Sequence, residues 1–217
     1  MSNITNEFVE SYIRELLPEE EGLFRDMEIY AEEHHVPIVH KEVAALLHVL
    51  TKSVGAKKVL EVGTAIAYSS LLFCRAMGHD GHITTIERNE DMIHQAKLNI
   101  KKASAEEQVR LLQGDAEEIL RFLQGSYDVI FLDGAKGQYN DFLSDCLHLL
   151  KPGGLLISDN ILYKGMIATD DLVVRRKRTI VNRMRSYLET ICDHPQLETS
   201  IIPIGDGLAL SYKRQEE

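Results

Sequence analysis

Residues 127–139, YDVIFLDGAKGQY, decide the fold that this sequence predicts. The first six of them form an apolar run typical of a buried strand, and Asp133 follows that run directly. A second run, Gly154 to Ser158, ends in the same way with Asp159 and Asn160. Open α/β sheets hold their ligands at the carboxyl ends of the strands. We therefore expect these three polar side chains to meet at one ligand-binding edge of a sheet.

The apolar runs recur along the chain with helical patterns between them. Five are rich in β-branched residues: Lys58 to Val62, His82 to Glu87, Val109 to Gln113, Tyr127 to Leu132 and Gly154 to Ser158. Strands that alternate with helices predict a parallel sheet covered on both faces. Two further runs around Gly205-Asp206-Gly207 predict a C-terminal antiparallel hairpin. The expected fold is thus α/β, with a doubly wound, mostly parallel, seven-stranded sheet.

Helices are expected between the strands and before the first one. The intervening patterns are Ser69 to Met77, Glu90 to Ala103, Ala116 to Leu123 and Tyr139 to Leu150, the last closed by Lys-Pro-Gly-Gly. The N-terminal patterns are Asn6 to Leu16, Leu23 to His34 and Lys41 to Lys52. We expect one domain, 1–217, made of a helical cap (1–55) and a core (56–217). The cap is expected to form a lid or the surface of a homodimer.

The composition bounds the class of protein. The chain has 217 residues, of which 44% are hydrophobic, and this is enough to bury a sizeable core. Its three cysteines form no CxxC pair, so a reduced, cytoplasmic setting is expected. No apolar stretch approaches the ~20 residues of a membrane span. The formal net charge of −10 argues against general affinity for polyanions, although charge can be distributed unevenly.

The polar residues after the fourth and fifth strands allow two interpretations. Asp133, Asp159 and Asn160 together form an all-oxygen set, which suits a hard divalent cation such as Mg²⁺. Alternatively, each group caps the helix that follows its strand, because Asp and Asn are good N-cap residues. Asp133 taken alone, or Asp159 and Asn160 taken alone, would favour the helix-capping interpretation.

The first three strands end in residues that suit a nucleotide-like ligand. Gly63 ends the first strand, and Glu61 precedes it by two residues. The second strand ends in Glu87, where an acid can accept hydrogen bonds from ribose hydroxyls. Asp115 follows the third strand in Gly-Asp-Ala. A dinucleotide site would need G-x-G-x-x-G, which is absent here.

These residues carry a resemblance to a known family. VLEVGTAIAYSS, TTIERN, GDA, FLDGAKGQY and LKPGGLLISDN resemble, in order, the motifs of metal-dependent class I S-adenosylmethionine O-methyltransferases, which include catechol and caffeoyl-coenzyme A O-methyltransferases. The resemblance covers roughly residues 36–212 and implies a Rossmann-like methyltransferase fold. Within the family, the register and the segment RRKRTIVNRMRSY are most similar to the bacterial tRNA 5-hydroxyuridine methyltransferases.

The resemblance implies roles for individual residues. Cofactor contacts would come from Ile38, Val39, Glu61, Gly63, Ser69, Glu87, Asp115, Ala116 and Asp133. The metal ligands would be Asp133, Asp159 and Asn160, and Lys136 would be the catalytic base. As an alternative, Lys136 is a solvent-facing loop lysine, and Tyr139 is either a cofactor contact or a core tyrosine. One departure from the family is Ala67, which stands where glycine is usual.

A basic segment stands out in an otherwise acidic chain. Six cations lie within eleven residues, from Arg175 to Arg185. Arg175, Arg176, Lys177 and Arg178 are expected to bind RNA phosphates, with tRNA as partner. Alternatively, the segment is a solvated helix face paired with acids such as Asp170 and Asp171.

Four functions compete at this point. The first is Mg²⁺-dependent methylation of 5-hydroxyuridine in the tRNA anticodon loop, and the second is O-methylation of a small catechol-like phenol. The basic segment favours the first, since a small-phenol enzyme has no need of it. A nicotinamide oxidoreductase is disfavoured by the missing G-x-G-x-x-G. A non-catalytic RNA-binding module would have no use for the metal-ligand set.

Overall fold

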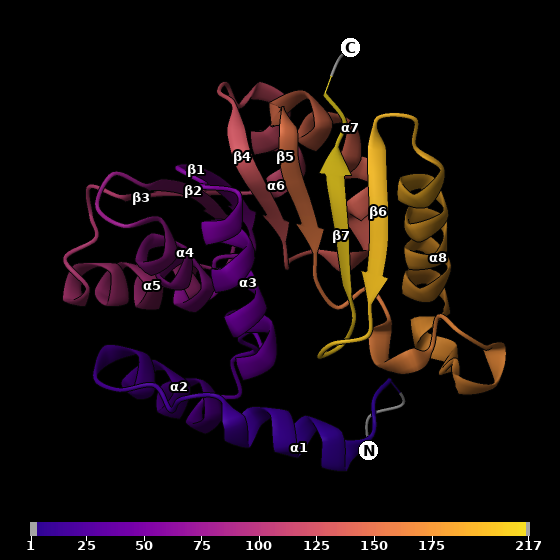
Figure 1. Cartoon of the computed structure of the whole chain (residues 1–217), viewed down its shortest axis with the longest axis horizontal. Helices are drawn as coiled ribbons and strands as arrows, with labels where there is room; N and C mark the ends of the chain where they lie inside the picture. Colours follow the sequence, from indigo (N-terminus) through magenta and orange to yellow (C-terminus); the bar gives the residue numbers. More distant parts are fainter. Residues whose placement is uncertain (1–3, 216–217) are drawn as a thin grey trace.

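The computed structural model describes residues 4–215 as a seven-stranded sheet with helices packed on it (Figure 1). The strand order is β3-β2-β1-β4-β5-β7-β6. The strands are β1 (Lys58–Val62), β2 (His82–Glu87), β3 (Val109–Gln113), β4 (Tyr127–Leu132), β5 (Leu150–Ser158), β6 (Leu197–Ile202) and β7 (Leu208–Lys213). Strands β1 to β5 pair in parallel, and β7 runs antiparallel to β5 and β6. The predicted mostly parallel sheet with a C-terminal hairpin is confirmed.

The helices follow the predicted pattern closely. They are α1 (Glu7–Leu16), α2 (Leu23–Glu33), α3 (Lys41–Ser53), α4 (Tyr68–Met77), α5 (Glu90–Lys102), α6 (Ala116–Phe122), α7 (Tyr139–Leu149) and α8 (Arg178–Asp193). Four short 3-10 turns lie in the loops: η1 (Lys136–Gln138), η2 (Tyr163–Gly165), η3 (Asp170–Leu172) and η4 (Arg175–Lys177).

Strand β5 differs from its prediction because it begins at Leu150 rather than at Gly154. Lys-Pro-Gly-Gly ends α7 at Leu149, as expected, but the same residues continue as extended chain beside β4. The pairing is irregular between Tyr127 and Val129, which accommodates this extra length.

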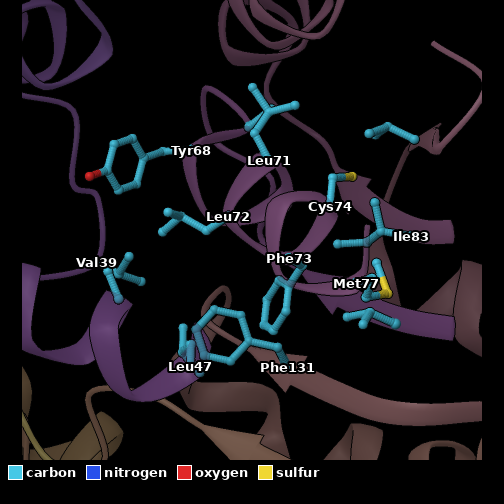
Figure 2. Close-up of a cluster of buried hydrophobic side chains, with 14 of the residues drawn as sticks. Val39, Leu47, Tyr68, Leu71, Leu72, Phe73, Cys74, Met77, Ile83 and Phe131 are labelled. Carbon is cyan, nitrogen blue, oxygen red and sulfur yellow. The ribbon is translucent and has the colours of Figure 1, made fainter. Parts of the chain in front are cut away.

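Each central strand buries both of its faces. Val59, Phe131 and Ile157 pack in a core with α2, α3, α4 and α5, and Figure 2 shows Phe131 beside Phe73 of α4. Their ring centroids are 5.6 Å apart in an edge-on arrangement. The neighbouring residues Leu60, Leu132 and Leu156 point into a second core with α6, α7 and α8. Alternating side chains therefore anchor the strands between two helical layers, which fixes the position of the strand ends.

The N-terminal helices differ in how deeply they pack. Helix α3 contributes Val43 and Leu47 to the first core, whereas α1 buries none of its residues. Arg14 of α1 donates two hydrogen bonds of 2.7 Å to the buried carboxylate of Glu42 on α3. The division into a cap of 1–55 and a core of 56–217 stays a prediction. None of the helices in residues 4–215 combines the length and apolarity needed to cross a bilayer.

Candidate active site

A cavity of about 880 Å³ opens at the carboxyl ends of the central strands. Its walls include Gly63, Glu87, Asp133, Asp159 and Asn160, which follow or end β1, β2, β4 and β5. The strand order changes direction between β1 and β4, and such a switch point is where doubly wound sheets bind ligands. The residues predicted from separate motifs therefore meet at one site.

A second, smaller cavity of about 70 Å³ adjoins the first. The two share Gly63, Glu87 and Gly134, and the smaller one is also lined by Asp115 and Ala116. Glu87 thus stands between a narrow slot beside β3 and a wide chamber beside β5. An elongated ligand could occupy both.

The carboxylates after β4 and β5 do not cap helices. The 3-10 turn η1 has Ala135 at its N-cap, and η2 has Leu162. Asp159 instead accepts a hydrogen bond of 2.6 Å from the backbone N–H of Asn160. The capping interpretation of these two acids is wrong, because loop residues separate each of them from the turn that follows.

Burial disfavours the charged forms of the two carboxylates and so raises their pKa values. Asp159 is 3% exposed, and burial raises its pKa to about 6. Burial also raises the pKa of Asp133, and the negative charge of Asp159 raises it further. The positive charge of Lys136 lowers the pKa of both groups, but it does not cancel the effect of burial. A bound cation would relieve this repulsion.

The donor set suits a hard cation. Two carboxylates and the amide of Asn160 line the same cavity and offer only oxygen ligands, if the amide oxygen faces the ion. Among residues 4–215, no cluster of three or more His, Cys, Asp or Glu side chains is arranged as a metal site. A divalent ion here would therefore depend on Asp133, Asp159, Asn160, water and substrate oxygens.

Tyr139 fixes the two strand ends relative to each other. Its hydroxyl lies 3.0 Å from the carbonyl oxygen of Leu132 and 3.2 Å from that of Asp159, so it can donate to either. The ring is buried and packs edge-on against Tyr187 of α8. The structure therefore supports the core interpretation of Tyr139.

Gly63 allows the loop after β1 to touch the loop after β4. Its φ is +103°, and a Cβ atom added there would lie 2.8 Å from the backbone nitrogen of Gly134 and 2.9 Å from the carbonyl carbon of Asp133. Backbone atoms cannot rotate away, so a side chain at Gly63 must displace the Asp133 loop.

We expect Gly63→Ala to lower the free energy of unfolding by about 1–3 kcal/mol more than Gly78→Ala does, because overpacking a tight contact has about this cost. Gly78 is the matched control: its φ is +76°, but an added Cβ would meet nothing within 4 Å. Urea unfolding of both variants measures the difference. Equal losses would show that the Gly63 contact is not under steric constraint.

Glu61 and Ser69 lie behind the cavity wall. Glu61 is fully buried, and its carboxylate accepts hydrogen bonds from Ser69 (2.5 Å), Thr85 (2.6 Å) and Ser70. Burial raises its pKa despite these three donors. The network joins β1, β2 and α4. Contact of Glu61 or Ser69 with a cofactor stays a prediction.

Glu87 is held by the backbone of two loops. One carboxylate oxygen accepts from the N–H of Ala65 (3.0 Å), and the other accepts from Arg88 and Asn89 (2.9 Å each). This fixes the side chain at the junction of the two cavities.

The remaining predicted cofactor residues line different cavities. Asp115 caps α6 by accepting from the N–H of Glu117 at 2.9 Å, and it lines the smaller cavity with Ala116. Ile38 and the buried Val39 line the larger cavity. Ala67, where the family usually has glycine, has the left-handed φ of 68° that favours glycine.

The basic segment does not form one uniform surface. Arg175, Arg176 and Arg178 are exposed, whereas Lys177 is half-buried and lies 5.8 Å from the centre of the Tyr163 ring. Two later arginines form hydrogen bonds to loops of the site instead. Arg183 donates to the Gly137 carbonyl at 2.9 Å, and Arg185 donates to the Ile167 carbonyl at 2.8 Å and pairs with Asp170 at 2.7 Å. Arg185 therefore pairs with a nearby acid, as the alternative interpretation expected. The side chains of Arg175, Arg176 and Arg178 are exposed instead.

Several cavity residues were not predicted from the sequence. They include Arg14, His40, Lys164 and Asp206, which all line the large cavity. The Gly-Asp-Gly pattern by itself predicts a hairpin turn and does not show that Asp206 reaches the cavity. Arg14 lies in an amphipathic helix whose sequence gives no sign of a site.

Comparison with known proteins decides the family. The family model for O-methyltransferases matches residues 20–214. The chain belongs to this O-methyltransferase family. It is 33% identical to an O-methyltransferase candidate of Mycolicibacterium vanbaalenii over 172 residues, covering 78% of this chain and 74% of that protein. It is 29% identical to a caffeoyl-CoA O-methyltransferase of Populus kitakamiensis over 171 residues, covering 76% of this chain and 73% of that protein.

Solved structures of O-methyltransferases share the fold. A candidate caffeoyl-CoA O-methyltransferase from Staphylococcus aureus superposes with a TM-score of 0.90 at 37% identity, covering 95% of this chain and 100% of that one. The O-methyltransferase TomG from Streptomyces achromogenes, solved in complex with SAM, gives a TM-score of 0.84 at 25% identity, with 96% of each chain covered. The Rossmann-like methyltransferase fold is therefore established for this member of the family.

Proposed function

We propose that this O-methyltransferase transfers a methyl group from S-adenosylmethionine to the 5-hydroxyl of 5-hydroxyuridine in the anticodon loop of tRNA, with Mg²⁺ or a similar ion bound. The observation that carries the proposal is the acid pair of buried Asp159 and half-buried Asp133, which lies with Lys136 in a cavity that adjoins a second one at Glu87. The exposed arginines after this site support an RNA substrate.

The joined cavities support S-adenosylmethionine as the methyl donor. The adenine would lie in the narrow slot near Asp115 and Ala116, the ribose at Glu87, and the methionine part beside Gly63. The TomG relative was solved with SAM. The carboxylate of Glu87 is already oriented by three backbone N–H groups, so it can accept ribose hydroxyls without rearranging.

Glu87→Ala is expected to weaken S-adenosylmethionine binding by about 1.5–3 kcal/mol, because hydrogen bonds to a charged acceptor are lost. Calorimetry with S-adenosylmethionine measures the change, and NAD should bind to neither protein. Glu90→Ala is the matched control, since Glu90 is exposed and lies outside both cavities. Wild-type affinity in Glu87→Ala would remove Glu87 from the cofactor site.

The residues at the wide end suit proton removal from an acceptor hydroxyl. Asp133, Asp159 and Asn160 would hold the divalent ion, which when bound acts as a Lewis acid toward the substrate oxygen atoms. Lys136 lines the same cavity, and its charge acts on both carboxylates. We assign Lys136 the role of accepting the hydroxyl proton as the methyl group is transferred.

Contacts between the basic segment and the site loops support a tRNA substrate. Lys177 lies over Tyr163, four residues after Asp159, and Arg183 holds Gly137, the neighbour of Lys136. Arg175, Arg176 and Arg178 are thus carried on elements packed against the site and are exposed to solvent. Cations in such a position can bind the phosphates of an RNA loop while one base enters the cavity.

A small catechol-like phenol is the second candidate substrate. The names of the relatives favour it more directly than they favour tRNA, since one is a caffeoyl-CoA O-methyltransferase and another is a candidate for that activity. A phenol with adjacent oxygens would suit the same oxygen-lined chamber. It would have no use for Arg175, Arg176 and Arg178.

One assay compares the two candidates. The purified protein is given S-adenosylmethionine and Mg²⁺ with either hydroxyuridine-bearing tRNA or free catechols, and kcat/KM is measured for each. We expect the tRNA to be the better substrate by several orders of magnitude. A higher kcat/KM for catechols would make the small phenol the substrate.

We also infer that the protein forms a homodimer through its cap. Helix α1 exposes Phe8, Tyr12 and Leu16 on one face, with exposed fractions of 85%, 62% and 67%. Apolar surface of this kind marks a contact surface. Sedimentation should give twice the mass of one chain for the wild type and a monomer for Phe8→Ser/Tyr12→Ser. A monomeric wild type would contradict the inference.

A further inference from the structure

The β6–β7 turn, Gly205-Asp206-Gly207, packs against the loop that follows β5. Gly207 has a φ of +87°, and a Cβ atom added there would lie 2.2 Å from Cγ of Leu162. On its other side the turn lies over His40 and Val43 at the start of α3. The hairpin turn is therefore wedged between the N-terminal helices and residues 160–164.

Residues 160–164 have an unfavourable backbone. Asn160, Tyr163 and Lys164 have φ values of 57°, 44° and 58°, and none of them is glycine. Asparagine tolerates the left-handed region, but Tyr163 and Lys164 stay there only where surrounding contacts impose it. Asn160, one of the proposed metal ligands, is the first residue of this loop.

The turn supplies the contacts that impose this conformation. The N–H groups of Ile161 and Leu162 donate to the carbonyl oxygens of Gly207 and Asp206, each at 3.0 Å. The N–H of Lys164 donates to the side-chain carboxylate of Asp206. Two of the three bonds need only backbone, so the Asp206 carboxylate is the side chain that fixes the far end of the loop.

Asp206 also lies at the cavity itself. It lines the same cavity as Asn160 and Lys164.

We infer that Asp206 is a positioning residue for the metal site: by binding the Lys164 N–H it holds residues 160–164 so that Asn160 stays beside Asp133 and Asp159. The inference rests on the proposed role of these residues as metal ligands. In this role Asp206 binds the backbone of the loop and is not itself a metal ligand.

Mn²⁺ binding by the full-length protein, followed by calorimetry, tests the inference. Asp206→Ala removes the acceptor and should weaken Mn²⁺ binding by about 10-fold to 100-fold, the usual effect of losing a group that orients a metal ligand. Asp206→Asn keeps an acceptor oxygen and should stay within about threefold of wild type. S-adenosylmethionine affinity should be unchanged in both variants, which also shows that both are folded.

A second variant separates positioning from general damage. Lys164→Gly adopts a left-handed conformation without strain, so the loop needs Asp206 less. Asp206→Ala/Lys164→Gly should therefore lose less Mn²⁺ affinity relative to Lys164→Gly than Asp206→Ala loses relative to wild type. Equal losses in the two backgrounds would overturn the inference.

Other outcomes are equally decisive. If Asp206→Asn loses as much Mn²⁺ affinity as Asp206→Ala, Asp206 is a ligand and the inference is wrong. If Asp206→Ala binds Mn²⁺ like wild type, the inference fails while the proposed metal site stands. If the wild type binds no Mn²⁺, the proposed metal site fails and the inference fails with it.

Discussion

Asp159→Asn is expected to lower turnover by at least about a hundredfold and, at the same time, to stabilise the metal-free protein at neutral pH. Burial raises the folded-state pKa of Asp159 from an ordinary 3.8 to about 6. A carboxyl group with a raised pKa contributes its stability below the unfolded pKa and loses it as the pH rises through the folded pKa. Above about pH 6 the wild type therefore carries a cost of about 1–3 kcal/mol that asparagine avoids.

Urea unfolding at pH 4 and pH 7.5, in buffer with EDTA, measures this effect. The variant should be more stable than wild type at pH 7.5, and the difference should disappear near pH 4. Asp80→Asn is the matched control, because Asp80 is exposed and distant from the cavity lining. A variant less stable than wild type at both values would show that the Asp159 carboxylate stabilises the apo fold.

The same variant reports on the metal. Mg²⁺ should stabilise the wild type, since a ligand that binds only the folded state shifts unfolding, and it should stabilise Asp159→Asn much less. Methyl transfer should fall by at least about a hundredfold, because the Lewis-acid contribution to catalysis is several kcal/mol. EDTA should abolish wild-type turnover, and added Mg²⁺ should restore it.

Replacing Arg175, Arg176 and Arg178 together with alanine is expected to raise the KM for tRNA by about 10-fold to 100-fold near physiological salt. Each lost phosphate contact to a single-stranded loop also reduces the slope of log affinity against log salt by about 0.7, so the slope should flatten by about 2. Affinity for S-adenosylmethionine should not change, since none of the three lines either cofactor cavity.

The control for this variant changes the same charge elsewhere. Lys97, Lys101 and Lys102 are exposed on α5, and their triple alanine variant should bind tRNA like wild type. Catechols, if they react at all, should react equally with all three proteins. A basic-segment variant that handles tRNA like the control would leave the small phenol as the better candidate.

The sequence predicted the sheet well because the relevant physics is local. Strands β1 to β4 were predicted to the residue, since each is a short apolar run bounded by polar or glycine-containing turns. The start of β5 was missed because Lys-Pro-Gly-Gly reads as a loop, and only pairing with β4 makes it extended.

The site was predictable to the extent that it lies at strand ends. Glu87, Asp133 and Asp159 could be brought together from topology alone, because parallel strands present their carboxyl ends to one edge. The position of Asp206 depends instead on how a hairpin turn, 42 residues after Lys164, packs on the 160–164 loop. Some arginines of the basic segment are exposed, whereas Arg183 and Arg185 bind loop carbonyls. Which carbonyls they reach depends on the tertiary packing and is not encoded in the local sequence pattern.

Product analysis after a single turnover tests the proposed chemistry most directly. Enzyme, hydroxyuridine-bearing tRNA and S-adenosylmethionine with an isotope-labelled methyl group are mixed with either Mg²⁺ or EDTA, and the digested nucleosides are analysed by mass spectrometry. We predict that the label appears as 5-methoxyuridine in the Mg²⁺ sample and is absent from the EDTA sample. Label in the EDTA sample would contradict the role of Asp133, Asp159 and Asn160, and tRNA left unlabelled under both conditions would contradict the proposed substrate.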